Sequence, residues 1–238
     1  MKRQKFIKMA AEQFGVLLFP RRCPFCGSVL GFSMECAECA PELKRYTRQI
    51  PRLPQGEHCL EYLSGGASVF RYDGCIRGAV LRMKNGGQVY YAKELGIYMA
   101  SRIFDCTFHQ QRGIIILSSV PVMKRFDLVI PVPPSDKSRG YNLPDVLAQQ
   151  LAWALDVPLR NDILKKIRET EKQEGRSAAE RMKNVKDAYR VEKPFDVEGK
   201  RVLLVDDVIT TGATLSNCAK ALCIAGALDV FAVTLAET

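Results

Sequence analysis

The sequence predicts an α/β protein, in which helices cover both faces of a parallel sheet, with a small cysteine-rich module in front of the sheet. From residue 68 to the end, short apolar runs alternate with segments of helical periodicity, which is the pattern of a parallel sheet. Ahead of this region, two Cys-x-x-Cys pairs follow one another closely, as they do in small metal-binding modules. A length of 238 residues suffices for one such domain and an appendage.

The composition is that of a folded protein that needs no disulfides. Hydrophobic residues make up 47% of the chain and charged residues 26%. The net charge of +9 favours anionic partners such as phosphate esters, nucleic acid or an anionic surface, although a solvated basic surface gives the same value. No apolar run approaches the length of about 20 residues that a membrane-spanning helix needs. We therefore expect a cytoplasmic protein with no transmembrane segment, whose cysteines are reduced or metal-bound.

Residues 1–20 predict an amphipathic helix that ends at Pro20. Charged residues stand between its apolar positions, and no small-residue cleavage site follows the basic start. We expect the apolar stripe to pack against the rest of the protein, with contact to a membrane surface as the alternative. The stripe recurs at helical spacing and consists of Phe6, Ile7, Met9, Ala10, Phe14, Leu17 and Leu18.

Residues 21–50 predict a zinc ribbon, and residues 51–67 a connector that contains several prolines and glycines. Four thiolates in two Cys-x-x-Cys pairs can surround one Zn²⁺ tetrahedrally, which leaves no open position for catalysis, so the metal is structural. Because the module is too small to bury a core, the metal supplies much of its folding energy. Reduced thiols without metal and an iron–sulfur cluster remain alternatives. The four ligands are Cys23, Cys26, Cys36 and Cys39.

Residues 68–238 predict the α/β domain. Its expected strands are four short apolar segments, and its expected helices lie between them. The strands are assigned to residues 68–72, 127–131, 201–205 and 230–235, and the helices to residues 73–83, 90–104, 143–155 and 213–225.

The segment 201–215 carries the clearest functional signal. An apolar strand ends in two adjacent carboxylates, Asp206 and Asp207, at the edge where ligands bind in open α/β sheets. A loop of small residues follows, whose backbone N–H groups can converge on a phosphate at the start of a helix. Carboxylates beside a phosphate site are explained by a sugar, because they accept hydrogen bonds from a vicinal diol. A metal that bridges the diol and a pyrophosphate is compatible with the same arrangement.

This segment resembles the 5-phosphoribosyl-1-pyrophosphate (PRPP) motif of type I phosphoribosyltransferases. The resemblance implies that Asp206 and Asp207 hold the ribose hydroxyls and that Mg²⁺ accompanies PRPP. Position 1 is Met and not the cysteine nucleophile of glutamine amidotransferases, so we expect no glutamine amidotransferase domain. By the resemblance, the 5-phosphate is held by Thr210, Thr211, Gly212, Ala213 and Thr214.

The order of features resembles the ComF (competence protein F, GntX-like) family over nearly the whole chain. The resemblance implies an amino-terminal zinc ribbon and a type I phosphoribosyltransferase domain. Two further blocks supply candidate catalytic groups: Lys84, in the segment before the pyrophosphate loop, and Arg139, in the sequence Lys-Ser-Arg-Gly-Tyr-Asn. Lys84 can equally be a helix-end lysine that favours the helix dipole. Residues 168–189 match the family's polar signature and are expected to form a loop over the ligand, with a solvated, charged surface segment as the alternative.

Two functions follow from these observations. The first is binding of PRPP or another ribose phosphate, with or without transfer of phosphoribose to an acceptor that the sequence does not identify. The second is a non-enzymatic protein that binds single-stranded DNA and assists DNA-uptake proteins in natural transformation, as the family name implies. The candidate DNA contacts of this second function are Lys44, Arg45, Tyr46, Arg48 and Arg52.

Overall fold

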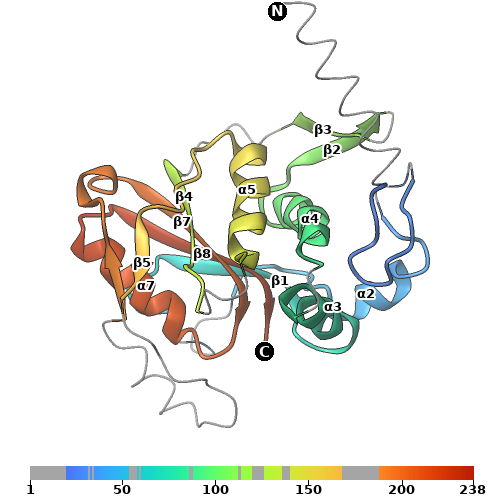
Figure 1. Ribbon diagram of the computed structural model, residues 1–238, viewed down its shortest axis with the longest axis horizontal. Helices are drawn as coiled ribbons and strands as arrows, with labels where there is room; N and C mark the ends of the chain where they lie inside the picture. Colours follow the sequence, from blue (N-terminus) through green and yellow to red (C-terminus); the bar gives the residue numbers. More distant parts are fainter. Residues whose placement is uncertain are drawn as a thin grey trace, which may run out of the picture.

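The computed structural model describes residues 20–31, 33, 35–53, 58, 60–85, 88–111, 114–119, 126–135, 140–167 and 188–238. Its elements follow the expected alternation of strands and helices (Figure 1). The helices are α2 (Ala40–Tyr46), α3 (Gly74–Asn85), α4 (Ala92–Phe104), α5 (Leu143–Leu155) and α7 (Ala213–Ile224), with 3₁₀ turns η1 (Val89–Tyr91) and η3 (Pro194–Asp196). The strands are β1 (Gly65–Arg71), β2 (Thr107–Gln111), β3 (Ile114–Ser119), β4 (Leu128–Pro131), β5 (Leu164–Lys166), β6 (Tyr189–Val191), β7 (Arg201–Ile209) and β8 (Asp229–Glu237).

The central sheet has four strands in the order β1-β8-β7-β4, and every pair in it is parallel. Strand β7 lies in the interior of the sheet, with Val205 beside Val233 of β8 and beside Pro131 of β4. Residues 202–205 of β7 are all buried, as expected for a strand that is covered on both faces. The sheet confirms the α/β fold class that the sequence predicts.

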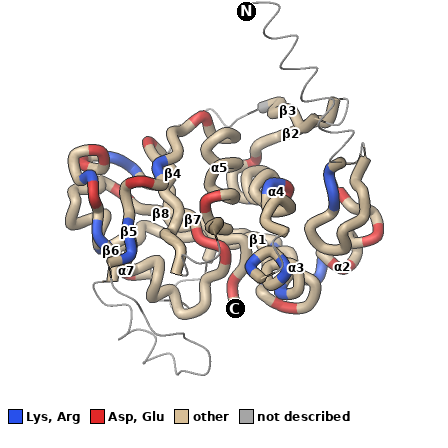
Figure 2. The backbone as a smooth tube through the Cα atoms, in the orientation of Figure 1, with Lys and Arg blue, Asp and Glu red and all other residues tan. Residues whose placement is uncertain are grey.

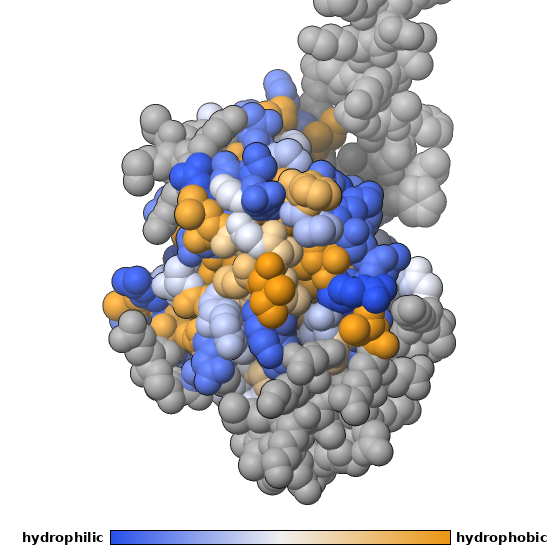
Figure 3. Space-filling model, turned by 90° about the vertical axis from the view of Figure 1, so that its left-hand side faces the viewer, coloured by the Kyte–Doolittle hydropathy of each residue, from blue (hydrophilic) through white to orange (hydrophobic). Residues whose placement is uncertain are grey.

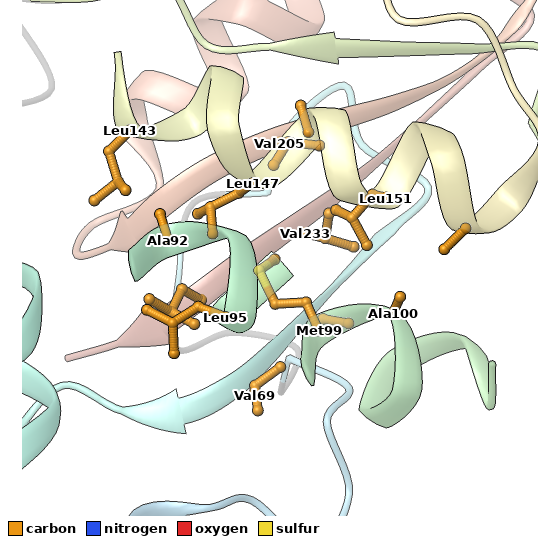
Figure 4. Close-up of a cluster of buried hydrophobic side chains, with 14 of the residues drawn as sticks. Val69, Ala92, Leu95, Met99, Ala100, Leu143, Leu147, Leu151, Val205 and Val233 are labelled. Carbon is orange, nitrogen blue, oxygen red and sulfur yellow. The ribbon is translucent and has the colours of Figure 1, made fainter. Parts of the chain in front are cut away.

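One face of the sheet is covered by α3, α4 and α5 (Figure 1). Figure 4 shows the core on this face, where Leu95 and Met99 of α4 and Leu147 of α5 pack over Val205 and Val233 of the sheet. The two helices approach closely because Gly96 of α4 has no side chain. A Cβ atom at Gly96 would lie 2.6 Å from Cβ of Gln150 and 3.2 Å from the carbonyl oxygen of Leu147.

The opposite face is covered by α7 and by the two-stranded β5–β6 sheet. Its core includes Leu204, Leu215, Cys218 and Leu222, all of which are fully buried. Figure 3 shows this side of the molecule, where hydrophobic residues stand among hydrophilic ones. Exposed apolar side chains on these elements and their connections include Phe195, Ile224 and Leu228.

The cysteine module packs directly against the α/β domain. The ring of Phe25 meets Phe70 of β1 edge to face at 6.0 Å, and Phe70 stacks on Tyr98 of α4 at 5.3 Å. Backbone bridges from Thr47 to Phe70 and from Arg52 to Ala67 run antiparallel along β1, so the chain after α2 extends the edge of the central sheet. The module therefore shares a core with the larger domain.

Apart from shifts of one or two residues at the ends of elements, the structure differs from the expected elements in three places. Strand β1 begins at Gly65 and not at residue 68, because Gly65 and Gly66 already pair with Phe231 and Ala232. The antiparallel pairs β2–β3 and β5–β6 were not expected, since their short strands carry weak alternation. Strand β7 extends to Ile209, so the acidic pair lies within the strand and not behind it.

Several predictions lie outside the described residues. These are most of the amino-terminal helix, the position of Arg139, and most of the expected loop 168–189. Among the described residues, no helix has the length and apolar character needed to span a membrane.

Candidate functional site

The acidic pair lies near the carboxyl end of β7, at the edge of the sheet where ligands of α/β proteins bind. Alternation along the strand points the two side chains to opposite faces. Asp207 is 7% exposed, while Asp206 is partly exposed and accepts a 2.8 Å hydrogen bond from the backbone N–H of Asp207. Strand pairing continues past the acids to Ile209 and Glu237, which holds the backbone of the pair rigidly.

The loop after β7 leads directly into α7. Gly212 is the N-cap residue of α7 and adopts a φ of 81°, a left-handed conformation that favours glycine. Among the residues that the structure describes, no side chain occupies the N-cap position of α7. The backbone N–H of Ala213 donates to Oγ1 of Thr211 at 3.4 Å, and the N–H groups that follow it can meet an anion. The geometry is therefore that of a phosphate-binding turn at a helix N-terminus.

Lys84 reaches this site from the last turn of α3. Its ammonium nitrogen lies 2.9 and 2.8 Å from the two carboxylate oxygens of Asp207. Figure 2 shows acidic positions at the end of β7 close to the basic positions of α3. Burial acts most strongly on Lys84 and lowers its pKa, but the charge and hydrogen bond of Asp207, with Asp206 and Tyr72, raise it overall. The lysine is therefore charged in the site, where it neutralises one of the two carboxylates.

Asp206 has an unusual protonation equilibrium. Although Asp206 is partly exposed as a residue, the protein around its carboxyl group keeps water away from it. This desolvation, followed by the negative charge of Asp207, raises the pKa of Asp206 to about 7, while Lys84 acts in the opposite direction. The charge of Asp206 therefore changes near neutral pH.

Tyr189 of β6 closes the site on the other face of the sheet. Burial and the nearby Cys218 and Asp206 raise the pKa of Tyr189, whereas a hydrogen bond to the side chain of Thr214 lowers it. Tyr189 therefore lies near Asp206 and near Thr214 of the turn. The sequence marked Tyr189 only as the end of a polar signature, because a single tyrosine carries no pattern of its own.

His58 is a second residue at the turn that sequence reasoning missed. Its Nδ1 lies 2.6 Å from the backbone carbonyl oxygen of Thr210, at the start of the phosphate-binding turn. Its Nε2 lies 3.7 Å from a carboxylate oxygen of Glu237, which also pairs with Arg48. The imidazole is 3% exposed. A histidine in an irregular connector belongs to no periodic pattern. The sequence therefore could not show that the fold brings it to this turn.

The Arg-Gly-Tyr-Asn sequence has a structural role in its described part. The hydroxyl of Tyr141 lies 2.6 and 2.9 Å from the carbonyl oxygens of Met83 and Lys84, at the end of α3. Asn142 occupies the N-cap position of α5, but its side chain donates to the carbonyl of Val132 at 2.8 Å and does not cap the helix. These bonds fix the end of α3 from which Lys84 extends.

The four cysteines of the amino-terminal module lie together. All four sulfur atoms lie within 4.8 Å of one another, with 3.8 Å between Cys23 and Cys39 and 3.6 Å between Cys26 and Cys36. Tetrahedral Zn²⁺ with bonds of about 2.3 Å needs sulfur atoms about 3.8 Å apart, so the cluster fits a metal ion of this kind.

The surroundings of the cluster also suit a metal. The hydroxyl of Ser28 is the main influence that lowers the pKa of Cys26, to about 6, while burial raises the pKa of Cys23 and Cys39. The backbone N–H of Phe25 points at the sulfur of Cys23 at 3.4 Å, as in a metal-binding knuckle. The cluster could therefore hold a metal ion in a closed four-sulfur site.

Comparisons with known proteins agree with this arrangement. The model of the phosphoribosyl transferase domain matches residues 137–238. Competence protein F of Haemophilus influenzae is 31% identical over 210 residues, which cover 84% of this chain and 83% of that protein. The DNA utilization protein YhgH of Salmonella typhi is 38% identical over 100 residues, or 42% of this chain and 43% of that protein.

Among solved structures, glutamine PRPP amidotransferase of B. subtilis, complexed with ADP and GMP, aligns over 60% of this chain and 25% of its own chain. Its TM-score is 0.38 and its identity 26%, a likeness too weak to carry a conclusion. The extent of the match to the Haemophilus protein settles the relationship. With its phosphoribosyltransferase-like α/β domain and its four-cysteine module, this chain belongs to the competence protein F family.

Proposed function

We propose that the chain binds PRPP or a closely related ribose phosphate at the carboxyl end of β7. The observation that carries the proposal is the acidic pair on β7, directly before a left-handed Gly212 turn at the N-terminus of α7. A carboxylate pair accepts hydrogen bonds from a vicinal diol, and the turn offers N–H groups to a phosphate. Ribose 5-phosphate joins these two groups within one small molecule.

The 5-phosphate is assigned to the turn. Gly212 and Ala213 are buried and present backbone, whereas Thr210, Thr211 and Thr214 contribute hydroxyl groups. Tyr189 orients Thr214, and His58 holds the carbonyl oxygen of Thr210. A preorganised turn of this kind binds an anion without first losing backbone freedom.

The pyrophosphate end is assigned to Lys84 and Arg139. Lys84 pairs with Asp207. When ribose hydroxyls donate to Asp207, the ammonium group can turn toward the pyrophosphate and stabilise its negative charge. Mg²⁺, bound with PRPP, supplies further positive charge to the diol and the pyrophosphate.

Transfer of phosphoribose would break the bond between C1 and the pyrophosphate oxygen, whose electron pair leaves with pyrophosphate, and form a bond from C1 to an acceptor nucleophile. Lys84 favours this step because it stabilises the charge that develops on the leaving group. The four-cysteine module holds a structural Zn²⁺ in this proposal and takes no part in the reaction, because its four ligands leave no open position.

Calorimetric titration with PRPP and Mg²⁺ tests the proposal. The double variant Asp206→Asn/Asp207→Asn should weaken binding by at least about tenfold, because amides replace the ionised acceptors. The matched control is Asp105→Asn, at the left-handed C-cap of α4, which should bind like the native chain. Absence of binding to the native chain, or equal binding by the double variant, would refute the site. Release of pyrophosphate upon addition of candidate acceptors tests turnover.

We also propose a second function, binding of single-stranded DNA, on the strength of relatives named for competence and DNA utilization. The structure narrows the candidate contacts. Lys44 and Arg45 on α2 and Arg52 after it are exposed, whereas the ring of Tyr46 packs beside Gly74 and Arg48 pairs with Glu237. The candidate basic contacts are therefore Lys44, Arg45 and Arg52, without an aromatic platform from Tyr46.

Gel shifts with single-stranded DNA over a salt series test this second function. Lys44→Glu/Arg45→Glu should weaken binding and reduce the salt slope by about 0.7 for each phosphate that is no longer neutralised. The control is Lys200→Glu, an exposed lysine just before β7. A shift that does not depend on salt, or one that the control changes equally, would exclude a phosphate contact at α2.

A further inference from the structure

A cavity of about 850 Å³ lies between the cysteine module and α4, separate from the acidic pair of β7. Its residues come from the first Cys-x-x-Cys knuckle, from α2 and from one face of α4. Apolar side chains form most of its wall, and charged ones stand at its rim. The apolar wall includes Phe25, Leu30, Leu43, Leu95 and Tyr98.

The described chain begins at the rim of this cavity. Arg21 donates two hydrogen bonds, of 2.8 and 2.7 Å, to the carboxylate of Glu94, which lines the cavity. The carbonyl oxygen of Arg21 accepts a 2.9 Å hydrogen bond from the backbone of Leu30, which also lines it. Arg21, close to the first described residue, therefore lies beside the open apolar wall.

The sequence of residues 1–19 has the pattern that such a wall requires. At 100° per residue, Phe6, Ala10, Phe14 and Leu17 fall within about 80° of one another. Lys8 and Glu12 fall on the opposite side of the same helix. A single face would thus be apolar, and the other would meet solvent.

We propose that residues 1–19 form a helix that docks its apolar face, centred on Phe14 and Leu17, in this cavity. The length of such a helix agrees with the length of the cavity along α4. Six residues separate Phe14 from Pro20, or about 9 Å of helix, and eight residues separate Glu94 from Arg102 along the cavity, or about 12 Å. Two to three turns before Pro20 therefore cover the length of α4 that lines the cavity.

Docking of this helix joins the cysteine module to the α/β domain from the outside. The module already contacts α4 and β1 through Phe25 and the Arg21–Glu94 ion pair. A helix across the cavity would shield both contacts from water. This inference does not depend on the ligand proposed for β7, and failure of one leaves the other intact.

Photo-crosslinking in the full-length protein tests the proposal. The photoreactive residue p-benzoylphenylalanine replaces Phe14 in one variant and Lys8, on the opposite face, in the control. We expect intramolecular crosslinks from position 14 to peptides that contain Leu43 or Tyr98, and few or none from position 8. Crosslinks between two chains would show that a second copy fills the cavity. Equal yields from both positions would show that the face is not docked. Either result would overturn the proposal.

Hydrogen exchange provides a second test. Leu17→Glu places a charge on the proposed docked face, and Lys8→Glu changes charge on the solvent face. We expect amide exchange in α4 and in the Phe25 knuckle to accelerate by about tenfold in Leu17→Glu and to stay unchanged in Lys8→Glu. Unchanged exchange in Leu17→Glu would overturn the proposal. A vesicle assay can also overturn it. If the native chain sediments with anionic phosphatidylserine vesicles and Leu17→Glu does not, the same face binds lipid and not the cavity.

Discussion

The ammonium group of Lys84 lies within 2.9 Å of both carboxylate oxygens of Asp207, although the two residues are 123 positions apart in the sequence. One belongs to the last turn of α3 and the other to the end of β7. The ion pair therefore links two elements that flank the proposed ligand. It neutralises the carboxylate of Asp207. In the proposed function, this neutralisation would reduce repulsion of a phosphorylated ligand, and Lys84 would supply the positive charge that meets the pyrophosphate.

Lys84→Met should destabilise the fold and weaken binding of PRPP. Removing the ammonium leaves Asp207 buried without a partner, which costs about 1–3 kcal/mol of unfolding free energy. Affinity for PRPP should fall by about tenfold, since the variant cannot make a charge-assisted hydrogen bond to the pyrophosphate. Thermal unfolding and calorimetry measure the two effects, with the exposed Lys93→Met as control. If affinity is unaffected while stability falls, Lys84 has a structural role only.

Asp206→Asn should change how stability depends on pH. Because the pKa of Asp206 is raised from 3.8 to about 7, the folded protein holds a proton that the unfolded chain has released. Stability of the native chain therefore decreases as pH rises through this interval. An asparagine cannot ionise, so the variant should gain about 2–3 kcal/mol relative to the native chain between pH 5 and pH 8. Parallel stability curves for the two proteins would contradict the raised pKa.

His58→Ala should loosen the phosphate-binding turn. The carbonyl oxygen of Thr210 would lose its 2.6 Å partner at the start of the turn. We expect the affinity for PRPP to fall by roughly threefold to tenfold, because an ordered turn would have to be reformed on binding. His58→Asn, whose amide can reach the same oxygen, should recover part of the loss. If His58→Asn binds PRPP no better than His58→Ala, and both variants lose the same thermal stability, His58 has a packing role alone.

Cys23→Ser should abolish metal binding and release the cysteine module. A serine hydroxyl is a poor substitute for a thiolate, and a metal in the four-sulfur cluster would supply folding energy to the module. Metal analysis after washing with a chelator should find about one Zn²⁺ per chain in the native protein and much less in the variant. Cys223→Ser, on α7 and distant from the cluster, is the control. Equal zinc contents in all three proteins would exclude the cluster as the site.

Gly96→Val should be strongly destabilising. The new side chain would begin 2.6 Å from Cβ of Gln150, so α4 and α5 would have to separate. We expect a loss of about 1–3 kcal/mol in unfolding free energy, as for an overpacked core. In Gly78→Ala the added atom meets only the flexible end of Arg82 at 3.3 Å, so this helical control should be neutral or slightly stabilising. Denaturant unfolding of both variants distinguishes the cases.

Much of the fold was legible in local patterns. The apolar run before Asp206 and the periodic segment after Gly212 predicted β7 and α7, because burial on both faces selects apolar residues. The limits of α5 were predicted as the structure has them. Strands β5 and β6 were not predicted, because each spans three residues and a period does not show over so few positions.

The sequence by itself determined the two chemical groups of this protein, the four cysteines and the acidic pair with its glycine turn, because each is contiguous or closely spaced along the chain. Only the tertiary structure decided which distant residues join them. The packing of α3 brings Lys84, which the sequence named only as a candidate, onto Asp207. The connector and β6 bring His58 and Tyr189 to the turn. Contacts between residues so far apart depend on how helices and strands pack, and local spacing does not record that packing.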